Sequence, residues 1–338
     1  MTHRLYCPIF MQSGMEIALP AHAARHAQVL RLQPGDAVEL FHGGWAALQA
    51  AAGGANPSAS AGSAGSAASA RAGGGASATG AFAAGVSVAD GLAEVAPPAC
   101  TTGYFHATIS HMGRSEVRAH IGEWHAPAKD SGVQVHIVCG MPANERMDWL
   151  VEKATELGVA SIQPVLTARS VLRLSGERAH KRVAHWQAIA VAACEQSGRT
   201  VVPPVLPIVD LRAFLAQPAA QTPTPTRQTQ PVQPAQQVCG LQEAGAHKWL
   251  LSVRPQSVAF EAVRAAIMQS GKATGVPMPV YFLSGPEGGL AEDEENTAIA
   301  QGWQPLSLGA HTLRAETAPL AVLAALGLSL QDLSLSSH

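Results

Sequence analysis

Apolar and polar positions alternate with two different periods along the second half of the chain. Short apolar runs that predict strands occupy residues 133–139, 161–166, 248–253, 279–284 and 304–308. Segments that predict helices lie between them, at residues 177–196, about 257–270 and 316–330, with a further helix beginning at the acidic turn 292–295. Strands that alternate with helices predict an α/β fold with a parallel sheet, which binds ligands at the carboxyl ends of its strands.

Another helix is predicted after the first of these strands. Asn144 is a candidate N-cap, and Gly158 is expected to end the helix. The apolar stripe of this helix, which we interpret as core, consists of Met147, Leu150, Val151, Ala154 and Leu157.

The first part of the chain, up to about Pro127, predicts a small β-rich domain with one helical segment at residues 20–30. Residues 36–41 predict a strand after the turn at Pro34 and Gly35, and residues 104–110 alternate like its partner. We therefore expect one domain at residues 1–128 and a second at residues 129–338.

Two low-complexity segments interrupt these domains. Residues 45–103 are dominated by Ala, Gly and Ser, and residues 217–246 are rich in Pro, Gln and Thr. Neither composition buries enough apolar surface to offset its ordering entropy, so both segments are predicted to be flexible inserts. Lengthening a hairpin loop from about four to about sixty residues costs only ~2 kcal/mol of closure entropy, so the host domain is expected to tolerate the first insert.

Composition narrows the classes of function. With 22 basic and 24 acidic side chains the net charge is −2, so contact with nucleic acid must come from a local basic patch. The five cysteines form no CxxC pair and the 14 histidines form no HExxH motif, so neither a disulfide framework nor a metal is predicted. Cys194 is interpreted as a packed thiol rather than a nucleophile, because no matched base accompanies it. The sequence shows no signal peptide and no membrane span, so we expect a soluble cytoplasmic protein.

Two glycine-bearing loops near the end of the chain are the strongest candidates for a ligand site. The first is Leu-Ser-Gly-Pro-Glu-Gly-Gly-Leu at residues 283–290, and the second is Ser-Leu-Gly-Ala-His-Thr-Leu-Arg-Ala-Glu-Thr-Ala-Pro at residues 307–319. Each loop leaves a predicted strand and enters a predicted helix, and Gly285, Gly288 and Gly289 allow the main chain to approach a ligand without a Cβ atom in the way. The sequence has neither a GxxxxGK[ST] phosphate loop nor a GxGxxG after a strand, which argues against a nucleotide hydrolase.

Four other segments, together with these loops, resemble the RsmE family, bacterial enzymes that methylate a uridine of small-subunit ribosomal RNA. The segments are residues 29–36, 146–158, 167–170 and 193–199. They span both predicted domains in order and leave out only the two inserts.

The resemblance implies an N-terminal PUA-like RNA-binding β-barrel and a C-terminal SPOUT methyltransferase domain whose chain forms a trefoil knot, a rare exception among folds. It also implies a homodimer with sites near the subunit interface, and S-adenosylmethionine as cofactor. The implied activity is methylation of N3 of a specific uridine in 16S rRNA within the 30S subunit.

S-adenosylmethionine requires an adenine slot, partners for its ribose hydroxyls and an exposed methyl-bearing sulfonium. The resemblance carries cofactor binding onto Leu283, Gly285, Pro286, Glu287, Gly288, Gly289, Leu308, Gly309, Leu313 and Thr317.

Arg314 is the candidate catalytic cation, because the ring nitrogen of uridine is a poor nucleophile until its proton leaves and charge spreads onto the ring oxygens. Glu316 is the second candidate catalytic residue, expected with Thr317 to orient Arg314 or the cofactor. Alternatively, Arg314 forms only a structural ion pair with Glu316 or another carboxylate. A carboxylate base is an open alternative that the sequence does not assign.

RNA is expected to contact local positive charge. The candidates are Arg4, Arg25, Arg31, Arg169, Arg173, Arg178, Lys181, Arg182 and Arg199. For the run from Arg169 to Arg182 the alternative is a solvated helix face. Phosphate contacts of this kind predict binding that weakens steeply with salt.

The chain departs from the family pattern at several positions, among them the region of Asn144, where the family commonly has a lysine. Ala310 and His311 replace a usual proline and arginine, and Ala168 replaces a usual glutamate. Two competing functions stay open: an RNA-binding assembly factor that lost turnover through Ala310 and His311, and a SPOUT methylase of another RNA site or atom. The joint presence of residues 29–36 and 146–158 argues against the second.

Overall fold

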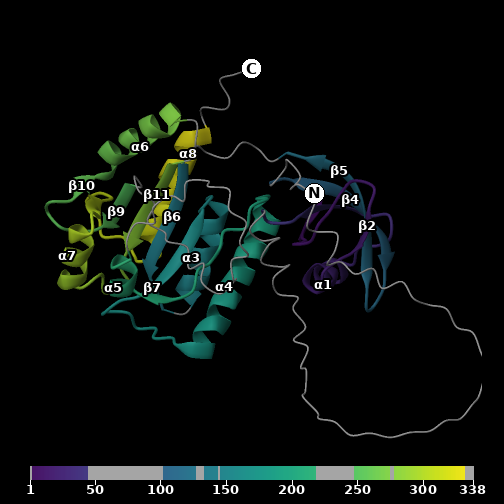
Figure 1. Ribbon diagram of the computed structural model, residues 1–338, viewed down its shortest axis with the longest axis horizontal. Helices are drawn as coiled ribbons and strands as arrows, with labels where there is room; N and C mark the ends of the chain where they lie inside the picture. Colours follow the sequence, from purple (N-terminus) through teal and green to yellow (C-terminus); the bar gives the residue numbers. More distant parts are fainter. Residues whose placement is uncertain are drawn as a thin grey trace, which may run out of the picture.

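The structure, a computed structural model, describes residues 2–44, 102–126, 133–143, 145–217, 247–274 and 278–331. Asn144 and nearly all of the low-complexity segments at residues 45–103 and 217–246 lie outside these ranges, so the predictions made for them stay predictions. The described residues form two sheets, and Figure 1 shows helices packed around the larger one.

The larger sheet is built by the second half of the chain. Its seven strands are all parallel, in the order β10-β12-β9-β11-β6-β7-β8. Their bounds are β6 Val133–Gly140, β7 Ser161–Leu166, β8 Val209–Asp210, β9 His247–Leu251, β10 Val258–Ala259, β11 Met278–Ser284 and β12 Gln304–Ser307. The predicted α/β fold with a parallel sheet is confirmed. The strands β8 and β10 were not predicted, because two residues carry no measurable periodicity.

Helices cover both faces of this sheet, as expected for parallel strands that are buried on two sides. They are α3 Glu145–Glu156, α4 Gly176–Ser197, α5 Leu211–Leu215, α6 Phe260–Thr274, α7 Glu292–Ala300 and α8 Thr317–Gln331. Of these, only the short α5 was not predicted from the sequence. None of the helices in the described ranges has the length and apolarity to span a membrane.

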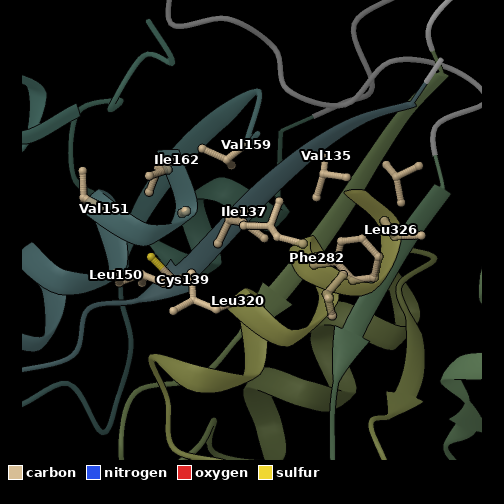
Figure 2. Packing of buried hydrophobic residues seen from close by; sticks show 14 of the residues in the cluster. Val135, Ile137, Cys139, Leu150, Val151, Val159, Ile162, Phe282, Leu320 and Leu326 are labelled. Carbon is tan, nitrogen blue, oxygen red and sulfur yellow. The ribbon is translucent and has the colours of Figure 1, made fainter. Parts of the chain in front are cut away.

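The alternation of side chains along the strands sorts the core into two layers. Ile137 and Phe282 face one layer, where they pack with residues of α3 and α8 such as Leu150 and Leu320 (Figure 2). Leu283, the neighbour of Phe282, faces the opposite layer with residues from α5 and α7. The strand β11, which carries the first glycine loop, is therefore packed on both faces.

The apolar stripe predicted on α3 is confirmed with one correction. Met147, Leu150, Val151 and Ala154 are fully buried, but Leu157 is 37% exposed. The helix ends at Glu156, and Gly158 turns the chain with a φ of +91°, so Leu157 lies past the last residue that faces the core.

The smaller sheet is built by the first part of the chain and has five strands in the order β1-β3-β4-β5-β2. The strands are β1 His3–Tyr6, β2 Glu16–Ala18, β3 Ala37–Phe41, β4 Tyr104–Met112 and β5 Val117–His125, and the helix α1 Ala21–Val29 packs beside them. β3 and β4 pair antiparallel, which confirms the pairing predicted across the first low-complexity segment. The pairings of the described strands give no ladder between β1 and β2, so the predicted barrel is not confirmed.

Polar contacts join the smaller sheet to the end of α4, which lies beside it in Figure 1. Glu195 on α4 accepts a hydrogen bond from the backbone N–H of Tyr6 at 2.9 Å and lies 3.1 Å from Nδ1 of His26. Arg4 pairs with Glu39 at 2.7 Å and also donates to the backbone oxygen of Arg199 at 3.4 Å. Glu195 is therefore the acidic group through which α4 holds both β1 and α1.

We predict that Glu195→Ala lowers the free energy of unfolding by about 1–3 kcal/mol, because a partly buried N–H and a histidine lose their acceptor. Urea denaturation measures this change. Glu152→Ala is the matched control: the side chain of Glu152 is 45% exposed and pairs with its neighbour Lys153, so its loss should change stability by less than about 0.5 kcal/mol. Equal effects of the two substitutions would contradict the role of Glu195.

Candidate functional site

The two glycine loops meet at one edge of the larger sheet. The first, residues 285–291, leaves β11 and enters α7, and the second, residues 308–316, leaves β12 and enters α8. β11 and β12 both pair in parallel with β9, one on each side of it. Since parallel strands end at the same edge, the two loops converge there, as predicted.

The first loop packs backbone against backbone. A Cβ atom at Gly285 would lie 2.6 Å from the main chain of Gly289 and Leu290, and Gly289 has a φ of +68°. The turn is closed by a 2.8 Å hydrogen bond from the N–H of Gly289 to the oxygen of Pro286. Glycine at position 285 is thus required by the lack of space, and at position 289 by the backbone conformation.

Gly140, at the end of β6, completes this packing and was missed by sequence reasoning. A Cβ atom there would come within 2.5 Å of Cδ and 2.7 Å of the nitrogen of Pro286. The available signal was a glycine directly after a predicted strand, which often marks a close approach of backbone.

Glu287 ties the first loop to the start of α3. Its Oε1 accepts hydrogen bonds from the N–H of Ala143 at 2.9 Å and from Nη1 of Arg146 at 3.3 Å. The carboxylate predicted to bind the cofactor is therefore engaged in holding the loop, while the exposed Gly288 lies at the tip.

A pocket of about 620 Å³ lies where the second loop faces the start of α3. It is lined by Glu145, Arg146, Trp149, Arg314, Glu316 and Thr317. The structure thus brings together the three residues predicted from the second loop with three residues of α3. Arg146 and Trp149 belong to a segment used for the family resemblance, but no site role was predicted for them.

Glu316 lines this pocket, although the residue is only 6% exposed. Its Oε1 is 4.0 Å from Nε of Arg146, and its Oε2 is buried with no hydrogen-bond partner among the described residues. Among the described residues, Arg314 makes no ion pair with Glu316. The cation that contacts Glu316 is Arg146. The alternative of a structural Arg314–Glu316 pair is therefore not observed.

The remaining predicted cofactor residues surround the two loops. Leu308 is half-buried, Gly309 has a φ of +125°, and Leu313 is 37% exposed. The backbone oxygen of Arg314 accepts from the N–H groups of Thr317 and Ala318, which starts α8. Beside the first loop, the hydroxyl of Ser284 is buried with no partner in the described residues, so it is available to a ligand that hydrogen-bonds.

The predicted RNA-binding cations fall into two groups. Arg4 and Arg199 lie between the two sheets, where Arg4 pairs with Glu39 and Arg199 donates to the oxygen of Thr155 at 2.9 Å. These contacts account for both side chains without RNA. The exposed group consists of Arg25, Arg31, Arg169, Arg173, Arg178 and Lys181, and Arg182 is half-buried against Asp148 and the ring of Trp186.

Arg169 links this basic group to the first glycine loop. Its Nη1 donates to the oxygen of Gly288 at 2.8 Å. The preceding residue, Ala168, donates its N–H to the buried carboxylate of Glu294, which also accepts from the N–H of Ala291. The backbone at Ala168 is therefore fixed to α7 although the family's usual glutamate is missing from that position.

Cys194 is packed rather than reactive. It is buried on α4, and burial raises the pKa of its thiol to about 11. A thiol that stays protonated at neutral pH is a poor nucleophile.

Known proteins share both the sequence pattern and the fold. Residues 129–327 match the model of a family described as an RNA methyltransferase domain. The chain is 28% identical over 218 residues to ribosomal RNA small subunit methyltransferase E of Bacillus subtilis, covering 64% of this chain and 75% of that one. The protein of the same name from Synechocystis is 29% identical over 202 residues, covering 59% and 54%.

A solved structure extends the similarity over nearly the whole chain. It is a ribosomal RNA small subunit methyltransferase E from Neisseria gonorrhoeae bound to S-adenosyl methionine, with 27% identity, a TM-score of 0.64 and coverage of 96% of each chain. The family match covers more than half of the chain and includes both glycine loops and α3. The chain therefore belongs to the RNA methyltransferase family, and within it to the RsmE group of SPOUT methyltransferases.

Proposed function

We propose that this protein transfers a methyl group from S-adenosylmethionine to N3 of a uridine in the 16S rRNA of the small ribosomal subunit. The observation that carries the proposal is the pocket beside the glycine loops, in which a buried carboxylate and two arginines line one cavity. Membership of a family of small-subunit rRNA methyltransferases supports the substrate class.

The first glycine loop fits the cofactor. Gly285 and Gly289 let the loop close tightly on its own backbone, and the hydroxyl of Ser284 lacks a partner among the described residues. Leu283, Gly285, Gly288 and Gly289 would hold the cofactor from the first loop, and Leu308, Gly309, Leu313 and Thr317 from the second. When bound, S-adenosylmethionine supplies an electrophilic methyl group on a sulfonium.

Arg314 stabilises the negative charge that develops on the substrate. Loss of the N3 proton spreads negative charge onto the two ring oxygens of uracil, and a guanidinium that lines the pocket stabilises that charge. Because Arg314 makes no ion pair in the described part of the chain, its charge is not already compensated by a carboxylate. The pocket also orients the ring, which contributes to the rate through positioning.

The wider assembly follows the family. We propose that the smaller sheet is part of a PUA-like RNA-binding barrel, that the chain threads through a trefoil knot around β9, β11 and β12, and that two copies form a homodimer. The strand order supports the knot. β11 pairs with one side of β9, and β12, which follows β11 in the sequence, pairs with the opposite side of β9. We also propose residues 1–128 and 129–338 as the two domains and the cytoplasm as the location.

Methyl transfer to small ribosomal subunits that lack base methylation tests the activity, with radiolabelled S-adenosylmethionine and the modified nucleotide identified by mass spectrometry. We expect label at N3 of uridine, and Arg314→Ala should lower kcat by about 10²–10³-fold. Arg264→Ala, at a half-buried arginine paired with Glu261 on α6, is the matched control and should leave kcat unchanged. Absence of label with folded wild-type protein would favour an assembly factor instead.

Cofactor binding has its own test at Gly285. A methyl group there meets backbone at 2.6 Å and must open the loop, so Gly285→Ala should weaken the affinity for S-adenosylmethionine by at least about tenfold in calorimetry. At Gly327, inside α8, an added Cβ atom would only touch the oxygen of Leu157 at 3.6 Å. Gly327→Ala should therefore leave the affinity unchanged, and an equal loss in both variants would contradict the assignment of the loop.

Binding to the ribosomal subunit should depend on the exposed basic residues at the start of α4. Replacing Arg178 and Lys181 by alanine should weaken binding. It should also make the negative slope of log affinity against log salt shallower by about 2, since each phosphate contact contributes about one unit. Filter binding at several salt concentrations measures both quantities. An unchanged slope would assign these residues to a solvated helix face.

A further inference from the structure

We propose that the pocket between α3 and the second loop reads the Watson–Crick edge of uracil, with Glu316 as acceptor and base, Arg146 and Arg314 as donors, and Trp149 as the stacking surface. This inference rests on the proposed function and goes beyond it by assigning the subsite of the target base. It assigns roles to Arg146 and Trp149, and it assigns Glu316 the role of general base in place of an orienting role.

The state of the Glu316 carboxylate points to a ligand that donates a hydrogen bond. One oxygen has no partner among the described residues, and the other lies 4.0 Å from Arg146, beyond hydrogen-bond distance. A buried carboxylate without donors is costly unless something else supplies them. The terminal torsion of glutamate is broad, so the carboxyl can rotate and present either oxygen to the pocket.

The donors and acceptor that line the pocket match uracil. The Watson–Crick edge of uracil offers an N3–H donor between two carbonyl acceptors, O2 and O4. Glu316 supplies the buried acceptor, whereas the second carboxylate of the lining, Glu145, is exposed. Arg146, which also donates to Glu287, and Arg314 supply N–H donors that accept nothing. Cytosine presents an unprotonated N3 and an amino group instead, so it would set a lone pair against the carboxylate and a donor against a guanidinium. The pocket therefore discriminates between the two pyrimidines.

Trp149 offers the surface on which such a base lies. It is 44% exposed although it is a large aromatic side chain, and it lines the same pocket as Arg146 from the next turn of α3. Enzymes that act on a base take it out of its stack, read its Watson–Crick edge and stack it on aromatic side chains. A volume of about 620 Å³ is within the usual range for a bound nucleoside-sized ligand.

The chemistry balances with these residues alone on the protein side. Glu316 takes the proton from N3, and the freed N3 electron pair forms a bond to the methyl carbon. The bond between that carbon and the sulfonium sulfur breaks with its electrons left on sulfur, which becomes a neutral thioether. Arg146 and Arg314 balance the negative charge on O2 and O4 until the methyl group has arrived, and Glu316 releases its proton to water.

The test compares wild-type protein with Glu316→Gln on small subunits that lack base methylation, across a range of pH. An amide keeps the shape of the side chain but cannot take the proton, so kcat should fall by about 10²–10⁴-fold. The residual rate should rise with pH. It should also recover on subunits that contain 5-fluorouracil, because fluorine acidifies N3–H. The affinity for S-adenosylmethionine, measured by calorimetry, should change less than twofold.

Glu261→Gln, at an exposed carboxylate on α6, is the control and should keep wild-type kinetics. A Glu316→Gln protein whose low rate shows neither pH dependence nor rescue by fluorine would overturn the role as base. Wild-type label at an atom other than uracil N3 would instead overturn the proposed function, so the two failures are distinguishable.

A second measurement covers the case in which Glu316→Gln fails to fold. Small subunits that contain 5-bromouracil, irradiated with the full-length protein in the absence of cofactor, should form a crosslink that maps to Trp149. Trp149→Phe should keep KM within about threefold, whereas Trp149→Ala should raise KM by about tenfold or more, as expected for the loss of one stacking contact. A crosslink at another site, with unchanged KM for Trp149→Ala, would overturn the stacking role.

Discussion

Backbone packs directly against backbone where β6 and β11 end, and the rest of the site is arranged around this contact. Gly140 lies so close to Pro286, and Gly285 to Gly289, that a single Cβ atom at either glycine would separate the two segments. The contact places Glu287 where it can accept hydrogen bonds from Ala143 and Arg146. Through these bonds the first loop determines where α3 begins, and therefore where Arg146 and Trp149 face the second loop.

The charged groups of the pocket leave a buried carboxylate available to a substrate instead of pairing it within the protein. Glu316 is nearly fully buried, yet its nearest cation lies 4.0 Å from one oxygen and the other oxygen has no donor in the described part of the chain. Pairing a buried carboxylate tightly within the protein would be more stable, but it would leave no acceptor for a substrate. Glu294 shows the contrast: it is equally buried, and both of its oxygens accept backbone N–H groups.

The helix α4 packs against the larger sheet and also contacts the smaller one. Its 22 residues span about 33 Å, from exposed cations at its start to Glu195 near its end. Glu195 contacts β1 and α1. The start of the helix comes shortly after Arg169 in the sequence, and Arg169 donates a hydrogen bond to the first glycine loop. One rigid element therefore fixes the distance between the smaller sheet, the basic surface and the candidate site.

Local periodicity was sufficient to predict the elements that carry the site. The strands that end at Ser284 and Ser307, the helices after them and the glycines between them all follow from residues within a few positions of one another, because strand and helix periods are local properties. The parallel sheet, and hence the convergence of the two loops, followed from the alternation of these elements. The contact between Glu316 and Arg146 and the surroundings of Arg4 and Arg199 did not follow. Arg146 and Glu316 meet only because α3 and α8 pack on the same face of the sheet, and Arg4 is enclosed only because two sheets meet at α4. Contacts between residues far apart in sequence depend on tertiary packing, which no local pattern encodes.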